Sequence, residues 1–241
     1  MEHKTDPRII AVIPALNEEI TIESMVQGAS KYVDRVIVVD DASTDDTAKL
    51  ARRAGAFVIS LPEQRRIGAV MKAGLVYAKK LEPDIIVTID AGGQHNPDDI
   101  PRLIQAVVDG RGDWALGSRF LHTPGRTKGL KALGTWIFSR LVTILTGQRF
   151  TDTMSGFRAL SRDVLLGLDL KFDYAYCPEM TLILCLEGYR VVEVPIQNKP
   201  RRHGKSKVVI NVLPYGIKQL GIVLFIFLKF KFLVKRLRNI R

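Results

Sequence analysis

The chain has 241 residues, of which 46% are hydrophobic and 25% charged, and this composition excludes a disordered, collagen-like or coiled-coil chain. Its two cysteines, Cys177 and Cys185, are too few for a disulfide framework and form no CxxC pair for zinc. Of the 36 Lys and Arg residues, twelve lie between positions 194 and 241, where there is no Asp or Glu, so the first 193 residues carry 24 basic and all 25 acidic groups. The net charge of +11 therefore belongs to the end of the chain and predicts an anionic partner there: phosphate groups, nucleic acid or a lipid surface.

The first half of the sequence alternates between strand and helix patterns. Apolar runs of strand length predict strands at Ile9–Ile13, Arg35–Val39, Phe57–Ser60, Asp84–Ile89 and Trp114–Gly117. The segments between them predict helices at Asn17–Lys31, Thr44–Ala54 and Gly68–Lys80, and one that begins after Asn96, with Ser43 and Asn96 as N-caps. Repeated units of this kind predict a mostly parallel sheet with helices on both faces.

The second half is less regular. The pattern predicts a long amphipathic helix, a strand or loop, a shorter helix, a last strand and a basic loop, at Lys128–Gly147, Met154–Leu160, Pro178–Glu187, Arg190–Val194 and Lys199–Lys207. An apolar tail follows, but its longest uninterrupted run, Leu220–Leu228, is much shorter than the roughly 20 residues that a spanning helix needs.

Polar and charged side chains follow several of the predicted strands. Asn17 and Glu18 come after the first strand, Asp40 after the second, Asp90 after the fourth and Arg119 after the fifth. Ligands of parallel α/β sheets bind at the carboxyl ends of the strands, where these residues meet. A carboxylate after a buried strand is costly unless it binds something, so we interpret Asp40 and Asp90 as ligand-binding residues.

The sequence contains neither GxGxxG after the first strand nor GxxxxGK[ST], which argues against a Rossmann dinucleotide site and a P-loop. An acid after the second strand can still accept hydrogen bonds from a nucleoside. An acid after the fourth strand can hold a divalent cation that bridges a diphosphate and stabilises it as a leaving group. Asp45, by contrast, is interpreted as a helix cap.

Several short motifs occur in a characteristic order: Pro14-Ala15-Leu16-Asn17-Glu18, Val39-Asp40-Asp41-Ala42-Ser43-Thr44-Asp45-Asp46-Thr47, the segment at Asp90, Gly117-Ser118-Arg119, Ser155-Gly156-Phe157-Arg158 and Arg201-Arg202-His203-Gly204-Lys205-Ser206-Lys207. Together they resemble the inverting family 2 glycosyltransferases of GT-A fold, and within them the dolichyl-phosphate mannose synthase and polyprenyl-phosphate glycosyltransferase group. The resemblance covers about residues 8 to 210.

This resemblance implies a GT-A domain at residues 1–207 and a basic, apolar, membrane-associating helical tail at 208–241. The implied activity is transfer of a hexose, mannose or glucose, from a GDP- or UDP-linked sugar to dolichyl or polyprenyl phosphate. The implied location is the cytoplasmic face of a membrane, with the protein peripheral or anchored in the interface.

The resemblance also implies roles for individual residues. The nucleotide would contact Pro14, Ala15, Asn17, Glu18, Asp40, Asp41 and Gly68. A divalent ion, Mg²⁺ or Mn²⁺, would be held by Asp90 and Gln94. The catalytic residues would be Asp90, Arg119 and Arg201, and the acceptor phosphate would contact Lys128, Arg201 and Lys207.

The sequence departs from the family pattern at one position. The family usually reads Asp-x-Asp after the fourth strand, whereas Gly92 stands at the second acid here. Three alternatives stay open: Asp90 and Gln94 hold the ion with water and the diphosphate, which suits Mg²⁺; the ion binds weakly; or the chain binds a nucleotide sugar without turnover.

No general base stands out in the sequence. A polyprenyl phosphate is already ionised and needs none, whereas a saccharide acceptor requires a carboxylate or His to remove a proton. His95, His122 and His203 are interpreted as surface or phosphate-adjacent residues, and Glu179 as a structural or acceptor-positioning group. We therefore expect a single in-line displacement with inversion, and keep a saccharide acceptor as the alternative.

The apolar and basic tail suits an interfacial helix on an anionic membrane, although a helix packed on the catalytic core or a dimer partner is the alternative. Nucleic-acid binding is disfavoured, because the basic residues alternate with aliphatic runs and no recognition motif is present.

Overall fold

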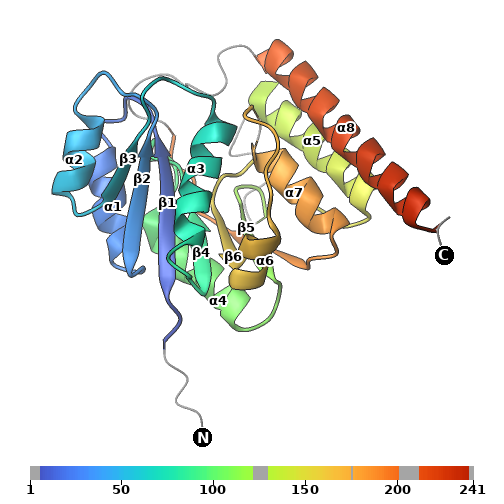
Figure 1. The fold of residues 1–241 in the computed structure, drawn as a ribbon, viewed down its shortest axis with the longest axis horizontal. Coiled ribbons are helices and arrows are strands. Elements are labelled where there is room, and N and C mark those ends of the chain that lie inside the picture. The colour runs from blue at the N-terminus through green and yellow to red at the C-terminus, as the bar shows by residue number, and fades with distance from the viewer. Residues whose placement is uncertain (1–5, 122–129, 175, 201–211, 239–241) are drawn as a thin grey trace, which may run out of the picture.

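A computed structural model of the chain describes residues 6–121, 130–174, 176–200 and 212–238. One seven-stranded sheet runs through it in the order β3-β2-β1-β4-β6-β5-β7 (Figure 1). The strands are β1 Ile9–Ala15, β2 Arg35–Asp40, β3 Phe57–Ser60, β4 Ile85–Thr88, β5 Trp114–Ser118, β6 Arg158–Ser161 and β7 Val191–Pro195.

The sheet is mostly parallel, as the sequence predicts. β6 is the exception, because it is inserted between β4 and β5 and runs antiparallel to both. Successive residues of a strand face opposite layers, so Val12 of β1 joins one apolar core and Ile13 joins the other. Both faces of the sheet are therefore covered, which explains why its strands read as continuous apolar runs.

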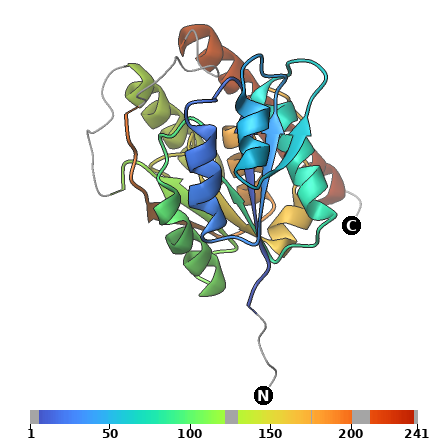
Figure 2. The same cartoon turned by 90° about the vertical axis from the view of Figure 1, so that its left-hand side faces the viewer.

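Helices cover the two faces of the sheet, as Figure 2 shows with the sheet seen edge-on. On one face lie α1 Ile22–Ser30, α2 Thr47–Arg53 and α4 Ile100–Val108, which continues the short 3-10 helix η1 Pro97–Asp99. On the other face lie α3 Ile67–Lys79, α5 Leu130–Thr146, α6 Arg162–Gly167 and α7 Tyr176–Leu186. This arrangement agrees with the prediction of helices on both faces of the sheet.

Two helices begin later than the sequence predicts. α1 begins at Ile22 instead of Asn17, and α2 begins at Thr47 instead of Thr44. Ser43 is not the cap of α2, because its hydroxyl accepts a hydrogen bond from the amide of Asn17. The residues before both helices thus form loops that bond to each other. Most of the other boundaries lie within two residues of the prediction.

The predicted cap at Asn96 is confirmed. The side chain of Asn96 accepts a hydrogen bond from the amide of Asp98, and Pro97 is the first helical residue. Asp45 is not the N-cap of α2, because that position is Asp46, but the Asp45 carboxylate accepts a hydrogen bond from the amide of Thr47, the first residue of the helix, at 3.0 Å.

The apolar tail forms one continuous helix, α8 Val212–Arg238, which packs on α7 and α5. Figure 1 shows α8 and α5 side by side at one end of the molecule. Among the described residues, no helix has the length and apolar character that crossing a membrane requires. The contacts with α7 and α5 confirm the core-packed alternative for the inner side of α8, where Gln219 and Val223 are buried.

The inner side of α8 contains a buried amide. Gln219 has no exposed surface, and neither its nitrogen nor its oxygen has a hydrogen-bond partner among the described residues. An unpaired buried polar group costs about 1–3 kcal/mol. We predict that Gln219→Leu raises the free energy of unfolding by about 1 kcal/mol in urea denaturation, because the unpaired amide is removed.

The matched control is Gln105→Leu, which changes an exposed glutamine whose side chain donates to Asp109. This control should give no gain in stability. A loss of stability in Gln219→Leu would contradict the prediction.

Candidate active site

The loops that follow β1 and β2 are joined by hydrogen bonds. The amide of Asn17 donates to Ser43 Oγ at 2.8 Å, that of Thr44 to Asn17 Oδ1 at 2.8 Å, and that of Glu18 to Thr47 Oγ1 at 2.7 Å. Asn17 has a φ of +48°, a left-handed conformation that Asn adopts more readily than most residues. Asn17 and Glu18 are thus fixed against the second loop at the carboxyl edge of the sheet.

Pro14 and Ala15 end β1 at this edge, where Ala15 pairs with Asp40 of β2. The Asp40 side chain is buried, and its Oδ1 accepts a hydrogen bond from the amide of Ser43 at 3.3 Å. The structure therefore brings these three predicted residues together beside the two joined loops.

Asp41 fixes the chain just before α3. Its buried carboxyl accepts a hydrogen bond from the amide of Arg65 at 2.6 Å, and burial raises the pKa of Asp41. Gly68, in the first turn of α3, donates its amide to the carbonyl of Asp173 at 2.7 Å. A Cβ atom on Gly68 would lie 2.3 Å from the carbonyl oxygen of Phe172, so only glycine fits. These contacts of Arg65 and Gly68 were not predicted from the sequence.

Asp90 follows β4, and 49% of its side chain is exposed to solvent. A Cβ atom on Gly156 would lie 2.7 Å from Asp90 Oδ1 and 2.4 Å from the hydroxyl of Tyr176. The Oγ1 of Thr88 donates to the carbonyl of Gly156 at 2.7 Å, which holds the glycine there. The Ser155–Arg158 motif therefore supplies the backbone against which the Asp90 carboxylate lies.

His95 is buried, so the surface alternative of the two that the sequence left open for it is wrong. Its Nδ1 lies 3.8 Å from Asp90 Oδ2, beyond hydrogen-bond distance, and has no partner among the described residues. The ring packs on Phe157, with 5.3 Å between centroids. Burial lowers the pKa of His95, so the ring is neutral at pH 7. The partners that enclose His95, Phe157 and Asn198, are far from it in the sequence, so no local pattern indicated its burial.

Arg119 is held by a carboxylate that sequence reasoning missed. Its Nε and one terminal nitrogen donate to Asp152 at 2.6 and 2.8 Å, and Asp152 is fully buried. Glu193 in turn accepts hydrogen bonds from the amides of Thr151 and Asp152. Arg119 therefore stands at the end of β5 with its guanidinium oriented by a buried partner.

The first residue of the basic loop and the residue before it lie beside the loop that follows Asp90. The amide of Lys199 donates to the carbonyl of Gln94 at 2.8 Å, and Asn198 forms a β-bridge with His95. The other predicted phosphate-binding residues and histidines lie outside the described residues: Lys128, Arg201, Lys207, His122 and His203.

Comparison with known proteins decides the family. The family described as "Glycosyl transferase family 2" matches residues 10–167. The chain belongs to this family. It is therefore a glycosyltransferase, as the motifs at Asp40, Asp90 and Gly156 predict.

Two relatives have lipid phosphates in their names. UDP-N-acetylglucosamine–dolichyl-phosphate N-acetylglucosaminyltransferase of Methanococcus voltae is 31% identical over 216 residues, covering 80% of this chain and 86% of the relative. Undecaprenyl-phosphate mannosyltransferase of Micrococcus luteus is 30% identical over 236 residues, covering 87% of this chain and 94% of the relative.

A solved structure has the same fold. Glucosyl-3-phosphoglycerate synthase of Mycobacterium tuberculosis, in complex with Mn²⁺, UDP-glucose and phosphoglyceric acid, superposes with a TM-score of 0.70. It is 26% identical in sequence, and the match covers 89% of this chain and 79% of that one.

Arg158, the last residue of the Ser155–Arg158 motif, is fully buried in the glycosyltransferase. Its guanidinium donates to the carbonyls of Ser155, Thr153 and Cys177 and lies over the ring of Trp114. This side chain ties the motif to the start of α7, so its observed contacts are structural.

Glu179, a candidate base in the sequence, is buried in α7. It accepts hydrogen bonds from the amides of Lys171 and Phe172, at 2.5 and 3.1 Å. Burial raises the pKa of Glu179 to about 7. These contacts agree with the structural or positioning interpretation of this residue.

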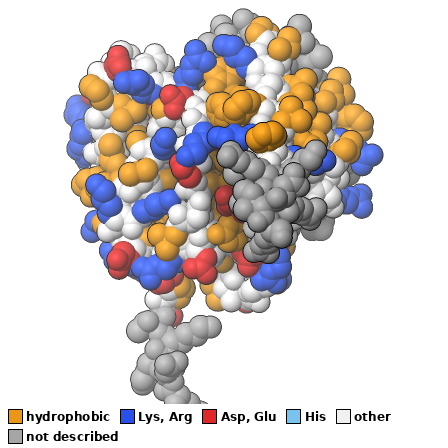
Figure 3. Space-filling model, turned by 45° about the vertical axis from the view of Figure 1, so that its right-hand side comes forward, with side chains coloured by type: hydrophobic (Ala, Val, Ile, Leu, Met, Phe, Trp, Pro, Cys, Tyr) orange, Lys and Arg blue, Asp and Glu red, His pale blue; other side chains and the backbone are white. Residues whose placement is uncertain are grey.

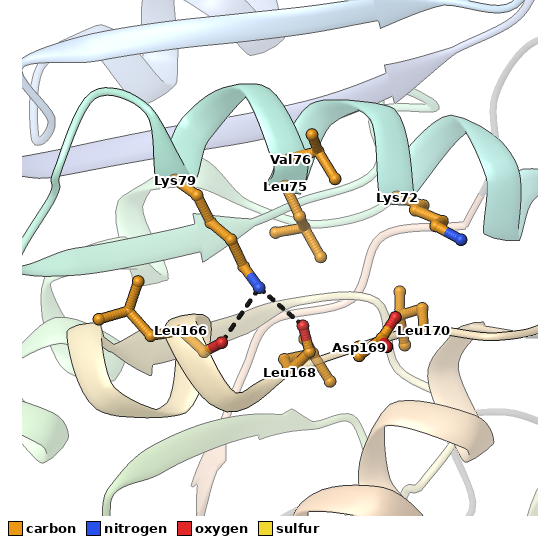
Figure 4. Close-up of a pocket in the computed structure, with 8 residues that line it drawn as sticks. All are labelled: Lys72, Leu75, Val76, Lys79, Leu166, Leu168, Asp169 and Leu170. Atoms are coloured by element: carbon orange, nitrogen blue, oxygen red, sulfur yellow. Dashed lines mark hydrogen bonds between the residues drawn. The ribbon is translucent and has the colours of Figure 1, made fainter.

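A cavity of about 300 Å³ lies between α3 and α6, away from the predicted site residues. Its lining is mostly apolar, and Lys79 crosses it to donate to the carbonyls of Leu166 and Leu168 (Figure 4). Lys79 therefore binds the carbonyls at the end of α6, and the cavity is separate from the candidate active site.

The outer sides of α5 and α8 form an apolar surface, the α5–α8 face, that is visible in Figure 3. Neither helix contains an Asp or Glu. The face consists of large exposed apolar side chains with basic ones among them: Leu133, Trp136, Ile137, Arg140, Ile144, Ile217, Lys218, Leu220, Leu224, Phe225, Leu228, Lys229, Lys231 and Phe232. The sequence predicted an amphipathic α5, but not that it shares one face with the tail.

We predict that Gly156→Ala lowers the free energy of unfolding by about 1–3 kcal/mol, because the new methyl group collides with Asp90 and Tyr176. Thermal and urea denaturation measure it. Adding Tyr176→Phe, which removes one colliding atom, should restore part of the loss.

Gly134→Ala is the matched control, since a Cβ atom there meets nothing within 4 Å and the position is inside α5. It should be neutral or stabilising. Equal losses in both variants would show that Gly156 has no special role.

Proposed function

We propose that this glycosyltransferase moves a hexose, mannose or glucose, from a GDP- or UDP-linked sugar to dolichyl or polyprenyl phosphate at a membrane surface. The observation that carries the proposal is the combination of an exposed Asp90 carboxylate with the apolar, acid-free α5–α8 face. β1 starts at the lower edge of the sheet in Figure 1, and α5 and α8 begin near the opposite edge, where β1 ends. An oily acceptor on that face would therefore present its phosphate toward Asp90.

The comparisons support a phosphorylated acceptor. The two relatives are named for dolichyl phosphate and undecaprenyl phosphate, and the solved structure contains phosphoglyceric acid. In this chain the phosphate of the acceptor would contact Arg119 and the basic residues Lys128, Arg201 and Lys207. The long apolar surface favours a lipid over a small soluble acid.

The nucleotide would bind along the joined loops after β1 and β2, in contact with Pro14, Ala15, Asn17, Glu18, Asp40, Asp41 and Gly68. Asp40 and Asp41 are buried beside these loops and would accept hydrogen bonds from the base or ribose. The fixed loop geometry supports this assignment, because a preformed site loses little freedom on binding.

The oxygen atoms that Asp90 and Gln94 offer as metal ligands fit Mg²⁺ or Mn²⁺ bound together with a diphosphate. Among the described residues no group of three His, Cys, Asp or Glu gathers to hold an ion alone. Asp90, which is half exposed, and Gln94 would hold it, while diphosphate and water oxygens complete the shell. When bound, the ion would offset the charge on the leaving diphosphate.

Of the candidate bases, the two that the structure describes are hydrogen-bonded or buried, which favours an ionised acceptor. Glu179 accepts hydrogen bonds from two backbone amides, and His95 is buried. An acceptor phosphate oxygen would attack the anomeric carbon while the bond from that carbon to the nucleoside diphosphate breaks. No proton needs to be removed, and the configuration at the anomeric carbon inverts.

Transfer of label from a nucleotide sugar to polyprenyl phosphate tests the proposal, after a thermal-shift screen of GDP- and UDP-sugars with and without Mn²⁺. We predict turnover by the wild-type chain and a loss of about 10²–10³-fold in Asp90→Asn, which removes a charge from the leaving-group side. Asp109→Asn, an exposed carboxylate after α4, is the control and should keep full activity.

Absence of labelled lipid with every donor and divalent ion would reject the proposed function. Label on an added saccharide would support the alternative acceptor. Activity that rises from near zero in Gly92→Asp would support the interpretation of the wild-type chain as a weakened homologue.

The two tryptophans allow a direct test of membrane contact. Trp114 is fully buried, whereas Trp136 is 60% exposed on the α5–α8 face. We predict that vesicles containing anionic lipid shift the emission to the blue, because Trp136 enters the interface, and that Trp136→Phe abolishes the shift. High salt should weaken it, since Arg140 and Lys218 supply part of the attraction.

Uncharged vesicles are the control for this electrostatic part. A blue shift that depends on protein concentration and occurs without lipid would instead indicate that the face joins two copies of the chain. An unchanged spectrum with anionic vesicles would contradict membrane contact through α5.

A further inference from the structure

A short connection between α6 and α7 contacts both the start of α3 and the tail helix. We call residues 171–174 the linking segment. It contains Lys171, Phe172, Asp173 and Tyr174, and it lies directly before α7. The ring of Tyr174 contacts both sides, whereas the other contacts on each side use different residues of the segment.

On one side the linking segment holds the first turn of α3. The carbonyl of Asp173 accepts from the amide of Gly68 at 2.7 Å, and the missing Cβ of Gly68 lets the two backbones touch. The guanidinium of Arg66 lies 4.9 Å from the centre of the Tyr174 ring. The residue before it, Arg65, is bonded to Asp41. Any displacement of the segment would therefore move the chain that Asp41 anchors.

On the other side the linking segment contacts α8. The rings of Phe172 and Phe225 meet edge to face, with 5.8 Å between centroids. The ammonium of Lys218 lies 5.1 Å from the centre of the Tyr174 ring. Tyr174 thus interacts with a cation from α8 and, through Arg66, with a cation from the start of α3. Such contacts of a charge with an aromatic ring contribute about 0.5–1 kcal/mol at exposed sites.

Glu179 determines where the linking segment lies. Its fully buried carboxyl binds the amides of Lys171 and Phe172, so the segment is fixed to α7 at its beginning. The side of α8 that packs on the core, in contrast, contains Gln219, whose side-chain amide has no hydrogen-bond partner among the described residues. A helix seated over an unpaired buried group is more easily displaced than the core of the sheet.

We propose that the packing of α8 against the linking segment sets the affinity of the candidate active site for its nucleotide. In this arrangement, a shift of α8 on contact with a lipid surface would change the positions of Gly68 and Arg65 through residues 171–174. The inference rests on the proposed function, because it takes the start of α3 as part of the nucleotide pocket. Coupling of this kind is reciprocal, so a bound nucleotide would also hold α8 more firmly.

The test measures binding of UDP and of GDP, each with Mn²⁺, to the full chain without lipid by titration calorimetry. We expect Phe225→Ala and Tyr174→Leu to weaken binding at least about fivefold, the lower end of usual coupling between sites. Tyr174→Phe keeps the ring between the two cations and should bind as the wild type does.

Phe232→Ala is the matched control. Phe232 is 70% exposed on the same helix, and the described residues include no ring or cation contact to it. Both phenylalanine variants lose a similar apolar area from the α5–α8 face, but only Phe225→Ala breaks the contact with the linking segment.

Hydrogen exchange provides a second measurement that needs no variant. The inference expects UDP or GDP, whichever binds, to slow amide exchange within α8. Wild-type affinity in both Phe225→Ala and Tyr174→Leu, or unchanged exchange in α8, would overturn the inference while leaving the proposed function intact. Failure of the wild-type chain to bind either nucleotide would overturn both.

Discussion

The Asp90 carboxylate remains accessible because Gly156 has no side chain. A single added carbon at that position would lie within 3.0 Å of both Asp90 oxygens and closer still to Tyr176. The antiparallel strand β6 creates this approach, since it pairs with β4 and brings the Ser155–Arg158 motif to the end of the strand that precedes Asp90. Only glycine therefore fits at position 156 of the motif. The buried Arg158 holds the same backbone, because its guanidinium donates to the carbonyls of Ser155 and Cys177.

Buried charges hold the rest of the sheet edge in place. Asp152 orients Arg119, and Glu193 holds the amides next to Asp152. Glu179 does the same for the linking segment. Each carboxyl accepts several hydrogen bonds, which offsets the cost of removing it from water. Asp90 itself stays half exposed, in the position where a diphosphate and its ion would bind in the proposed function.

The fold shows where the uneven charge of the sequence lies on the molecule. The acid-free last fifth of the sequence forms α8, and α8 packs beside α5, which is also without acidic residues. Apolar and basic side chains are thereby gathered on one face, to which neither of the two helices contributes an acid. A large exposed apolar patch of this kind marks an interaction surface, and the basic residues in it favour an anionic one.

The sequence by itself determined the α/β architecture, the glycosyltransferase family and the residues that gather at the carboxyl edge. Apolar strand runs and short motifs are local patterns, so Asp40, Asp90 and Asn17 could be identified as candidate site residues from the order and spacing of the motifs. The tertiary structure decided that Ser43 bonds to Asn17 instead of capping α2, that His95 is enclosed, and that Asp152 orients Arg119. It also decided that α5 and α8 share one face and that residues 171–174 touch both α3 and α8. These features join residues far apart in the chain, and no local pattern records which of many possible partners a side chain meets once the helices pack.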